Sequence, residues 1–467
     1  MRRLTAFALL AAPALGLAPH GATAAKSMPA HRFVVADSLR WPEGTEVLRF
    51  ENLEGIILVP GRLRGRAGAD TSGPLALDTG AGYLALDVSL ARILGIADSA
   101  ADSQAVGIAE RALPRLTLGS WTLDQVEPVL TVDGDVVRRV SDRPVLGLVG
   151  QKPLGDRAVW IDYREGVLAL IPLGRFAQAE DLPADVSGSG ATAVDPDPTR
   201  AAAASDSALR RSRVLLGGVI TPQAVPVRFS LVGDGKILVH GRLSDPRPPQ
   251  YSAPLNLLVD TGATKCVLFE DALSPLVRHA DAWPALRGLS APTLIGLAEA
   301  RIARVPEIQI DAEGAPLRAR DVDAGVVRSE LGDVLSRVTR RTVHGLVGYS
   351  MLKRFRVIVD YPDRVLWLDP IPGYRDDRPF EYCHVGLQLE RRAGAVIVTG
   401  VALDSPAAQA GIQRGDEVVS MDGVTARSED LVELTRRMEG EPGRRVTLVI
   451  RRGAVEHTYR LVRRRLL

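Results

Sequence analysis

The tripeptide Asp-Thr-Gly occurs twice in the chain, beginning at Asp78 and at Asp260. Each copy follows a short apolar run that is typical of a buried β-strand. Two carboxyl groups about 3 Å apart cannot both ionise, so one keeps a proton and the other a charge. Such a pair can take a proton from water and give one to a carbonyl group, and it titrates as a unit. The residues therefore indicate metal-free hydrolysis, provided that the fold brings the two aspartates together.

The second Asp-Thr-Gly belongs to a longer internal repeat. Short sequences recur in the same order around both copies: Gly61-Arg62-Leu63 and Gly241-Arg242-Leu243, Gly107-Ile108-Ala109-Glu110 and Gly296-Leu297-Ala298-Glu299, Gly147-Leu148-Val149-Gly150 and Gly345-Leu346-Val347-Gly348, Ile161-Asp162-Tyr163 and Val359-Asp360-Tyr361. The order is kept while the spacing grows in a few steps, as insertions in loops would produce. The chain therefore contains two copies of one domain, each able to supply one aspartate to a shared site.

Each copy reads mainly as β-strand, because its apolar residues occur in short runs or alternate with polar ones. Tyr361-Pro362-Asp363-Arg364 has Pro and Asp where a type I turn favours them, between two apolar runs, which predicts a hairpin. A short helix is expected after the first Asp-Thr-Gly, with Asp87 as its N-cap and Gly95 at its end. Residues 182–213 are rich in Ala, Ser, Asp, Gly and Pro without sustained periodicity, which indicates a flexible linker.

With these motifs in view, the two copies resemble the retropepsin-like aspartic proteases, over about residues 40–172 and 225–370. The resemblance implies that Asp78 and Asp260 are catalytic and that their neighbours support the catalytic loops: Thr79, Gly80, Thr261 and Gly262. It also implies a flap in each copy, over residues 106–110 and 295–299, with Gly107 and Gly296 inside them. Residues 148–150 and 346–348 are then the segments that pack behind the catalytic loops.

The sequence departs from the viral members of that family in one place. Those members carry Arg and then Asp or Asn after the last Gly, whereas Gln151-Lys152 and Tyr349-Ser350 follow it here. The viral mode of locking two subunits together is therefore not expected. Because one chain holds both copies, they are expected to form an intramolecular, pepsin-like pair. Pairing of each copy with another chain is the alternative.

From Val385 onward the chain resembles a bacterial PDZ domain of the kind attached to exported proteases, with the longest matches at residues 405–412 and 415–423. The resemblance implies a carboxylate-binding loop and a following strand made of Val385, Gly386, Leu387, Gln388 and Leu389. Backbone N–H groups of such a loop bind a peptide carboxylate, and the peptide adds a strand to the sheet edge. A helix from about Ser428 to Met438 is expected, with Leu431 either lining the peptide groove or in the core.

Residues 1–25 have the pattern of a secretory signal peptide. Arg2 and Arg3 precede an apolar stretch over residues 4–18, and Ala22-Thr23-Ala24 gives the small-x-small pattern of a cleavage site. The stretch is too short to span a bilayer comfortably. The mature protein is therefore expected in the periplasm or secreted, without a stable membrane span. A retained N-terminal helix is the alternative.

The charge balance argues against nucleic acid as a partner. Two of the 58 basic residues, Arg2 and Arg3, fall in residues 1–25 and no acid does, so 56 basic and 56 acidic residues remain. A neutral protein has no field to hold a phosphate backbone. The two cysteines, Cys266 and Cys383, are permitted to pair in an exported protein, but the sequence leaves open whether they do.

One further pattern points to a different chemistry. Ser350-Met351-Leu352-Lys353 fits the Ser-x-x-Lys of acyl-serine enzymes. Neither Ser-Asp-Asn nor Lys-Thr-Gly accompanies it, and the matching segment of the first copy, residues 152–155, has no such pattern. We therefore expect Ser350 and Lys353 to be structural.

Together these features predict a mainly β protein with two pseudo-symmetric retropepsin-like lobes in a pepsin-like pair and a C-terminal α+β PDZ domain. The expected divisions are a signal peptide over 1–25, lobes over 33–176 and 214–371, a linker over 177–213 and a PDZ domain over 380–467. The predicted function is an exported aspartic endopeptidase that acts on proteins or peptides through an Asp–Asp pair that activates water, without a cofactor or metal. A catalytically silent peptide-binding or scaffold protein of the cell envelope is the alternative.

Overall fold

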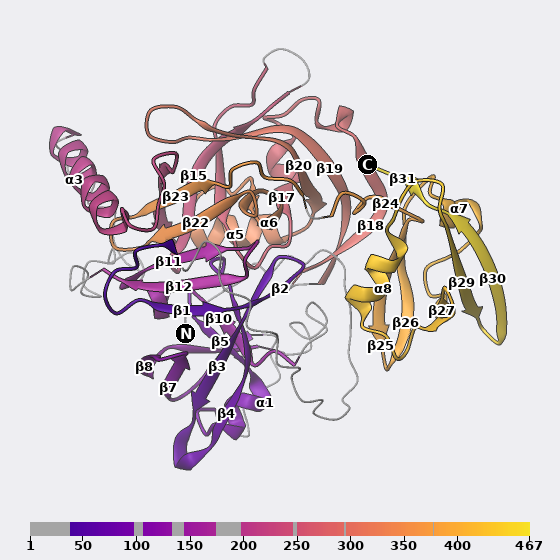
Figure 1. Cartoon of the computed structure of the whole chain (residues 1–467), viewed down its shortest axis with the longest axis horizontal. Helices are drawn as coiled ribbons and strands as arrows, with labels where there is room; N and C mark the ends of the chain where they lie inside the picture. The colour runs from indigo at the N-terminus through magenta and orange to yellow at the C-terminus, as the bar shows by residue number, and fades with distance from the viewer. Residues whose placement is uncertain are drawn as a thin grey trace.

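The fold class is confirmed: the chain is mainly β, with two lobes that pair and a separate C-terminal domain (Figure 1). A computed structural model of the chain describes residues 38–97, 106–132, 144–173, 198–245, 250–293, 296–376 and 378–467. The expected signal peptide lies outside these residues. No helix within the described ranges combines the length and apolar character that crossing a bilayer requires.

Lobe 1 is one sheet with the strand order β6-β9-β5-β10-β4-β3-β7-β8, and β2 pairs with β3. The short helix α1 (Val88–Ile93) follows β5 as expected, because the Asp87 carboxylate accepts hydrogen bonds from the Ser89 and Leu90 backbone N–H groups. Gly95, at φ +68°, ends the helical turn. The strands are β2 (Glu51–Leu53), β3 (Ile56–Arg64), β4 (Asp70–Leu77), β5 (Leu84–Asp87), β6 (Val106–Ile108), β7 (Leu113–Leu118), β8 (Trp121–Val126), β9 (Val129–Val132) and β10 (Gly147–Val149).

Lobe 2 repeats the central part of this arrangement in a sheet with the order β14-β15-β16-β21-β17-β20-β19-β18. The duplication is visible in the pairing: β10 lies parallel to β4, and β21 lies parallel to β16. The strands are β14 (Ser230–Val232), β15 (Lys236–Leu243), β16 (Leu255–Val259), β17 (Cys266–Phe269), β18 (Ala285–Thr293), β19 (Gly296–Ile310), β20 (Leu317–Arg328) and β21 (Gly345–Val347). The helices are α4 (Glu270–Leu273), α5 (Leu331–Thr339) and α6 (Tyr349–Leu352).

The two lobes share a six-stranded antiparallel sheet, to which each contributes three strands, so they form an intramolecular pair. Its order is β1 (Glu46–Arg49), β12 (Val167–Pro172), β11 (Arg157–Asp162), β22 (Phe355–Asp360), β23 (Val365–Pro370) and β13 (Val225–Arg228). The lobes meet where β11 pairs with β22. The expected hairpin at Tyr361–Arg364 joins β22 to β23. Trp160 and Trp367 are fully buried on this sheet and help to hold it together.

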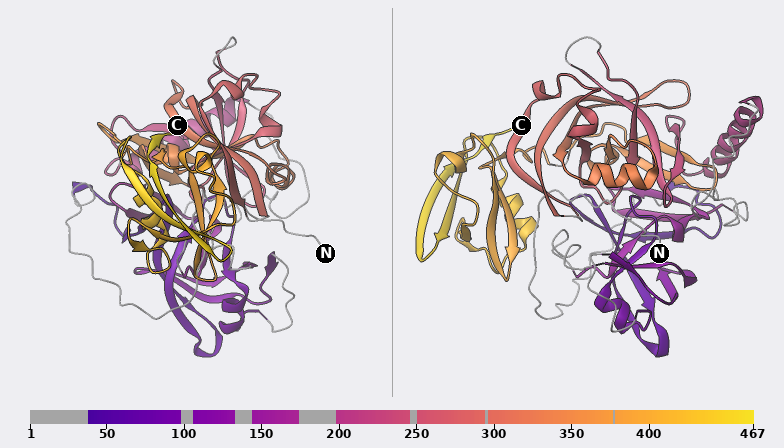
Figure 2. Two further views of the ribbon diagram at one scale, coloured as in Figure 1. Left: turned by 90° about the vertical axis from the view of Figure 1, so that its right-hand side faces the viewer. Right: turned by 180° about the vertical axis from the view of Figure 1, so that it is seen from behind.

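The expectation of a flexible linker is wrong for its second part, because a helix, α3 (Pro198–Leu216), covers residues 198–213. The run of four alanines from Ala201 has high helix propensity, and Pro198 suits the first helical position. The C-terminal end of the helix packs on the shared sheet: Ser212 is buried and its Oγ accepts a hydrogen bond from Trp367 Nε1 at 2.8 Å. In Figures 1 and 2, α3 lies at the opposite end of the molecule from the C-terminal domain.

The C-terminal domain is a small sheet with the order β25-β26-β27-β29-β30, in which β28 pairs with β27, and it has its own hydrophobic core. Cys266 and Cys383 are buried free thiols, so no disulfide links this domain to lobe 2. Its elements are β24 (Cys383–His384), β25 (Leu387–Arg392), β26 (Ala395–Val401), α7 (Pro406–Gln409), β27 (Glu417–Met421), β28 (Val424–Thr425), α8 (Leu431–Met438), β29 (Arg445–Arg452), β30 (Val455–Val462) and β31 (Arg464–Arg465).

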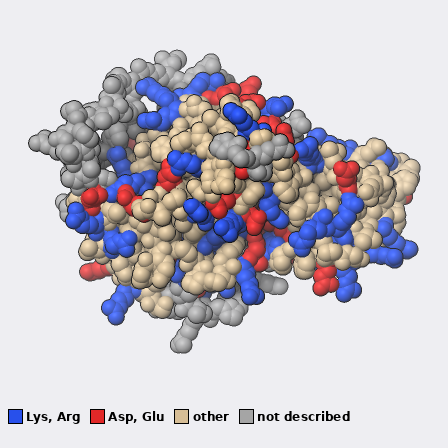
Figure 3. Space-filling model, turned by 90° about the horizontal axis from the view of Figure 1, so that it is seen from above, with Lys and Arg blue, Asp and Glu red and all other residues tan. Residues whose placement is uncertain are grey.

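This domain lies beside β18 of lobe 2 (Figure 1). On the face shown in Figure 3, basic and acidic side chains are intermixed and form no large field of one sign. That face matches the even charge balance of the sequence.

Candidate active site

The two aspartates lie at equivalent strand ends, one in each lobe. Asp78 follows β4 and its N–H donates to the Val149 carbonyl oxygen at 3.0 Å. Asp260 follows β16 and its N–H donates to the Val347 carbonyl oxygen, also at 3.0 Å. The segments predicted to pack behind the catalytic loops are therefore the strands that hold them. The parallel pairings of β4 with β10 and β16 with β21 fix where each loop begins.

The threonines of the two motifs cross the boundary between the lobes. The Thr79 N–H donates to Thr261 Oγ1 and the Thr261 N–H donates to Thr79 Oγ1, both at 3.0 Å. In return, Thr79 Oγ1 donates to the Val259 carbonyl oxygen at 3.0 Å and Thr261 Oγ1 to that of Leu77 at 3.1 Å. These four buried bonds obey the twofold symmetry of the repeat and lock one loop against the other, as the resemblance implied for these residues.

The glycines of the motifs let the loops approach each other. A Cβ added at Gly80 would lie 2.6 Å from Cγ of Asp260, so no larger residue fits there without moving that carboxyl group. The Gly80 and Gly262 N–H groups each donate at 2.8 Å to Oδ1 of the aspartate two residues earlier. The sequence thus folds each Asp-Thr-Gly into a tight turn that holds its own carboxylate.

The two carboxyl groups are buried and lie within hydrogen-bonding reach of each other. Among the residues that the structure describes, neither Asp78 Oδ2 nor Asp260 Oδ2 receives a hydrogen bond, although both atoms are buried. Burial raises the pKa of Asp78 to about 6, against the lowering effects of Asp260 and Lys236. Burial, and then the charge of Asp78, raise the pKa of Asp260 well above its ordinary value. The raised pKa values favour a protonated carboxyl group within the pair.

A buried lysine, Lys236 at the start of β15, lies next to the Asp-Thr-Gly loop of lobe 1. Its Nζ donates to the Gly80 carbonyl oxygen at 2.7 Å and lies 2.9 Å from Oδ1 of Asp234. Its positive charge lowers the pKa of both Asp78 and Asp260. In lobe 1, Ile57 pairs with Leu77, the residue before Asp78. In lobe 2, extending the pairing of Leu238 with Leu258 by one residue places Ile237 opposite Val259, the residue before Asp260. Ile56 is therefore the residue of lobe 1 that corresponds to Lys236. Sequence analysis missed Lys236, because no repeat or motif marks it.

The predicted flap residues lie in two different settings. In lobe 2, Gly296 is at the tip of the β18–β19 hairpin, where it pairs with Thr293. In lobe 1, Gly107 lies on β6 and pairs with Thr131 of β9. The residues that precede β6, and residue 295 of the second predicted flap, lie outside the described ranges.

Ser350 and Lys353 of the Ser-x-x-Lys pattern are not arranged as a nucleophile and its base. Ser350 Oγ donates to the Asp323 carbonyl oxygen at 2.6 Å and accepts from the Cys266 N–H at 2.8 Å. Lys353 Nζ is paired with Asp376 at 2.7 Å. The hydroxyl proton of Ser350 is therefore held by a backbone carbonyl and not by a base. Ser350 and Lys353 are structural residues of α6 and its surroundings.

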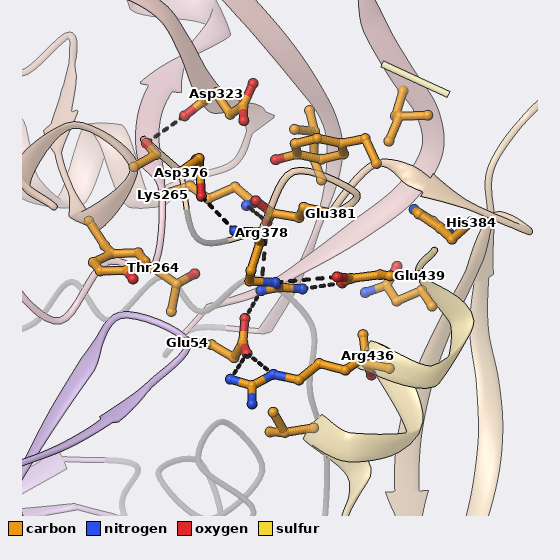
Figure 4. A pocket seen from close by; sticks show the side chains of 18 of the residues that line it. Glu54, Thr264, Lys265, Asp323, Asp376, Arg378, Glu381, His384, Arg436 and Glu439 are labelled. Atoms are coloured by element: carbon orange, nitrogen blue, oxygen red, sulfur yellow. Dashed lines mark hydrogen bonds and ion pairs between the residues drawn. The ribbon is translucent and has the colours of Figure 1, made fainter. Parts of the chain in front are cut away.

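A cavity of about 270 Å³ lies between the C-terminal domain and the two lobes. Figure 4 shows charged side chains along it, with Glu54 pointing between Arg378 and Arg436. Of the predicted peptide-binding residues, Leu387, Gln388 and Leu389 line this cavity, whereas Val385 and Leu431 do not. Among the lining residues of the C-terminal domain are the following: His384, Ala402, Val432, Thr435, Arg436, Met438 and Glu439.

The expectation for Leu431 is corrected in favour of the core. Its side chain is fully buried in the cluster of the C-terminal domain, and Val385 is buried in the same cluster. The helix α8 begins at Leu431 after the Asp430 cap, so Val432 and Thr435 face the cavity instead. Gly386 keeps the loop conformation with φ +90°, and its N–H donates to His384 Nδ1 at 2.9 Å. The apolar spacing of α8 alone did not distinguish its two sides.

Comparison with known proteins identifies the C-terminal domain. The PDZ domain family matches residues 397–452. Two curated relatives, each called a probable CtpA-like serine protease, come from Staphylococcus saprophyticus and Staphylococcus haemolyticus. They are 27% identical to this chain over 85 and 95 residues, which is 18% and 20% of it. The chain spans only 17% and 19% of the length of these relatives.

Three solved structures share smaller or larger parts of the fold. The photosystem II D1 C-terminal processing protease is 28% identical over 18% of this chain and 23% of its own, with a TM-score of 0.17. The PDZ domain of a carboxy-terminal protease from Vibrio cholerae, solved with a peptide, is 21% identical over 18% of this chain and 93% of its own, and its TM-score is also 0.17. The aspartic proteinase from Irpex lacteus is 12% identical over 70% of this chain and 98% of its own, with a TM-score of 0.37.

These comparisons contradict the predicted function, an exported aspartic endopeptidase acting through an Asp–Asp pair. The curated relatives are named as serine proteases. The prediction gave most weight to the repeated lobes, whereas the relatives share about a fifth of this chain. The domain at the C-terminal end is a PDZ domain, and the curated proteins that share sequence with this chain are called proteases.

Proposed function

We propose that this protein is a protease, that is, a hydrolase of peptide bonds, whose PDZ domain binds the C-terminal end of a protein or peptide. The names of the curated relatives support the hydrolase class, and the PDZ domain supports recognition of a chain end. The signal pattern of residues 1–25 supports a further part of the proposal, which is export from the cytoplasm.

The proton-transfer site of this protease, in our proposal, is the carboxyl pair of Asp78 and Asp260. The observation that carries it is that the two carboxyl groups are buried together at the lobe boundary, and that one oxygen of each receives no hydrogen bond among the described residues. In our proposal the two groups share one proton. Such a pair gives and takes protons in one site. The carboxylate type of enzyme, and the retropepsin-like relationship of the lobes, are proposed on this geometry. Ser350, whose hydroxyl is held by backbone groups, is the comparison residue.

Three substitutions in the full chain test this proposal against the serine chemistry of the relatives. Asp78→Asn and Asp260→Asn keep the shape of the side chain but remove the shared proton. Each is expected to slow cleavage of an unfolded, fluorescently labelled protein by at least about a hundredfold, the usual contribution of acid–base catalysis. Ser350→Ala is expected to leave the rate within about twofold. Thermal unfolding of all variants checks that they are folded.

The possible outcomes separate the parts of the proposal. Loss of activity in Ser350→Ala, with activity kept in both Asn variants, would move the chemistry to the serine and overturn the carboxyl site. If the parent protein cleaves no substrate between pH 4 and 8, the protease proposal itself fails. The two aspartates do not line the cavity beside the PDZ domain, so binding of chain ends is judged separately in the Asn variants.

A further inference from the structure

We infer that the C-terminal end of a bound chain is held in a composite site, with one wall from the PDZ domain and the other from the two lobes. This inference rests on the proposed binding of chain ends by the PDZ domain. It does not depend on which residues hydrolyse the chain. The site is the cavity of about 270 Å³, and residues from all three parts of the molecule line it.

The PDZ wall offers an open strand edge. Strand β25 is the end strand of its sheet and, among the described residues, pairs only with β26. Leu387 and Leu389 of this strand line the cavity, and Val432 and Thr435 of α8 line it from the other side. An extended chain placed between β25 and α8 can therefore pair with the free edge of β25. The side of that chain away from the PDZ domain would face the lobes and not bulk water.

Part of the lobe 2 wall, next to the PDZ domain, is apolar and only partly covered. Leu289 of β18 and Ile302 of β19 line the cavity and are half-buried, while their neighbour Leu286 is buried. An apolar surface left half-exposed in a cavity gains stability when an apolar group covers it. The two side chains lie on the same hairpin whose tip carries Gly296. A ligand in the cavity would thus contact the PDZ domain and the base of the lobe 2 hairpin together.

The position of this wall is fixed by direct contacts with the PDZ domain. The Leu403 N–H, just after β26, donates to the Arg287 carbonyl oxygen of β18 at 2.9 Å. The register of β18 shifts between Leu286 and Leu289, and Gly288 in the bulge has φ +83°. A Cβ at Gly288 would lie 2.7 Å from the Val401 carbonyl oxygen, so the bulge needs glycine to come this close. The wall is therefore built against the PDZ domain, and Leu289 emerges from the bulge into the cavity.

Lobe 1 closes the third side with the turn between β2 and β3. Leu53 and Ile56 line the cavity, and they belong to the same apolar cluster as Val432 of α8. Between them, the Glu54 carboxylate accepts hydrogen bonds from Arg378 and from Arg436 of α8 (Figure 4). This charged contact holds the turn beside the groove. The cavity therefore has fixed walls on three sides.

The size and lining of the cavity indicate what it holds. Ligand pockets of proteins usually measure roughly 300 to 1,000 Å³, so about 270 Å³ suits the last one or two residues of a chain and not a folded partner. The wall residues Leu289, Ile302, Leu387 and Leu389 are aliphatic. In the described part of the chain, six acidic and six basic residues also line the cavity, so their charges balance and favour no strongly charged side chain. The occupant is therefore the apolar C-terminal end of an extended peptide.

Peptide binding by the full chain tests this inference. The probe is a short fluorescein-labelled peptide that ends in Leu with a free carboxylate, compared with its C-terminal amide. Fluorescence anisotropy reports binding by the otherwise unchanged protein, and mass spectrometry of the recovered peptide checks that it has not been cleaved. Leu289→Asp and Ile302→Asp place a charge against the apolar end and are expected to weaken binding at least about tenfold. Leu289→Ala, which only removes contact area, is expected to weaken it about threefold.

Matched variants make the result decisive. Val455→Asp adds the same charge to an exposed site on β30 that does not line the cavity, and it is expected to change affinity less than about twofold. Thr435→Trp fills the groove beside α8 and is expected to abolish binding. The inference is overturned if the lobe 2 variants, shown to be folded by thermal unfolding, bind like the parent while Thr435→Trp does not bind. It is also overturned if the parent fails to bind the free-carboxylate peptide. Absence of cleavage, in contrast, bears only on the proposed function.

Discussion

The two aspartates belong to a cluster of buried ionisable residues. Asp78, Asp260, Asp234 and Lys236 are all less than a tenth exposed and lie in one cluster between the lobes. Burying a charge is costly unless a partner compensates it. Lys236 compensates Asp234 directly, and protonation of the pair reduces the charge that Asp78 and Asp260 carry in the interior. The cluster is therefore most stable when the pair keeps a proton.

A pH-dependent loss of stability follows from the raised pKa values of the pair. In an unfolded chain an aspartate has a pKa of about 4, whereas burial raises that of Asp78 to about 6 and that of Asp260 well above the ordinary value. The folded chain binds these protons more tightly than the unfolded chain. Their contribution to the unfolding free energy is therefore complete below about pH 4 and is lost as the pH rises through about 6. We expect the parent to lose more unfolding free energy than the Asp78→Asn, Asp260→Asn double variant between pH 4 and 7, measured by urea unfolding. Asp360, whose pKa burial also raises to about 6, is present in both proteins and cancels in the difference. Parallel pH profiles would contradict the raised values.

Lys236 provides a second test at the scale of a residue. Lys236→Met keeps most of the side-chain volume but leaves Asp234 buried without its cation. Removing one partner of a buried ion pair costs about 3–5 kcal/mol, because the remaining charge stays uncompensated. Urea unfolding at neutral pH should show a loss of this size. The Lys236→Met, Asp234→Asn double variant should be more stable than the single variant. If both variants unfold like the parent, the lysine contributes no buried charge pair.

At the scale of the element, helices and turns whose structure depends on a local rule could be predicted from the sequence. Asp87 caps α1 and the Tyr361–Arg364 hairpin forms as expected, because capping and turn chemistry act within a few residues. The strands beside each aspartate could be expected for a related reason, since the repeat showed their sequences twice. The pairing of Asp78 with Asp260 followed from the same duplication.

The failures have a different physical origin. Helix α3 was missed because its alanine run carries no apolar period, and its end is positioned by Ser212 and Leu216 packing on the shared sheet. Leu431 was misplaced because the side of α8 that faces the cavity is set by contacts with lobe 1, through Val432. Lys236 left no signal, since one of its partners, Gly80, belongs to the other lobe and meets it only after the lobes pair. Contacts between domains, unlike caps and turns, are not written in a local pattern.

The central strands of the two lobes give a prediction at this scale. Gly147 of β10 and Gly345 of β21 each face a neighbouring backbone: an added Cβ would lie 2.1 Å from the Ala85 carbonyl oxygen and 2.3 Å from that of Val267. Gly147→Ala and Gly345→Ala must push strands apart, and we expect each to destabilise its lobe by about 2 kcal/mol or more in urea unfolding. Gly325→Ala in β20 is the matched control, because its nearest neighbour is 4.0 Å away. Equal stability of all three variants would show that the strand spacing is looser than described.

At the scale of the whole molecule, the three parts are joined by different means. The lobes share a continuous sheet and exchange four buried threonine hydrogen bonds, so they form one body. The PDZ domain is joined by the contact of β18 with β26, by the packing of Val432 on lobe 1 and by ion pairs. Salt screens exposed ion pairs, so we expect high salt to weaken the contact between the PDZ domain and the lobes.

Arg378 is the centre of that ionic contact, and it gives the last prediction. Its guanidinium binds Glu54 of lobe 1 and Glu439 of the PDZ domain, and its charge, after that of Lys265, helps to lower the pKa of Glu381 to about 2 against the effect of burial. Arg378→Ala leaves these acids facing one another. We expect hydrogen exchange in α8 and in the β2–β3 turn to become about tenfold faster, which corresponds to about 1.4 kcal/mol of lost protection, while exchange in β11 and β22 stays unchanged. Arg427→Ala, which removes an exposed ion pair with Glu417 inside the PDZ domain, is the matched control and should leave α8 and the turn protected. Unchanged exchange in Arg378→Ala would mean that the β18 contact and the packing of Val432 hold the PDZ domain in place, because the charged contact would then contribute nothing measurable to the docking.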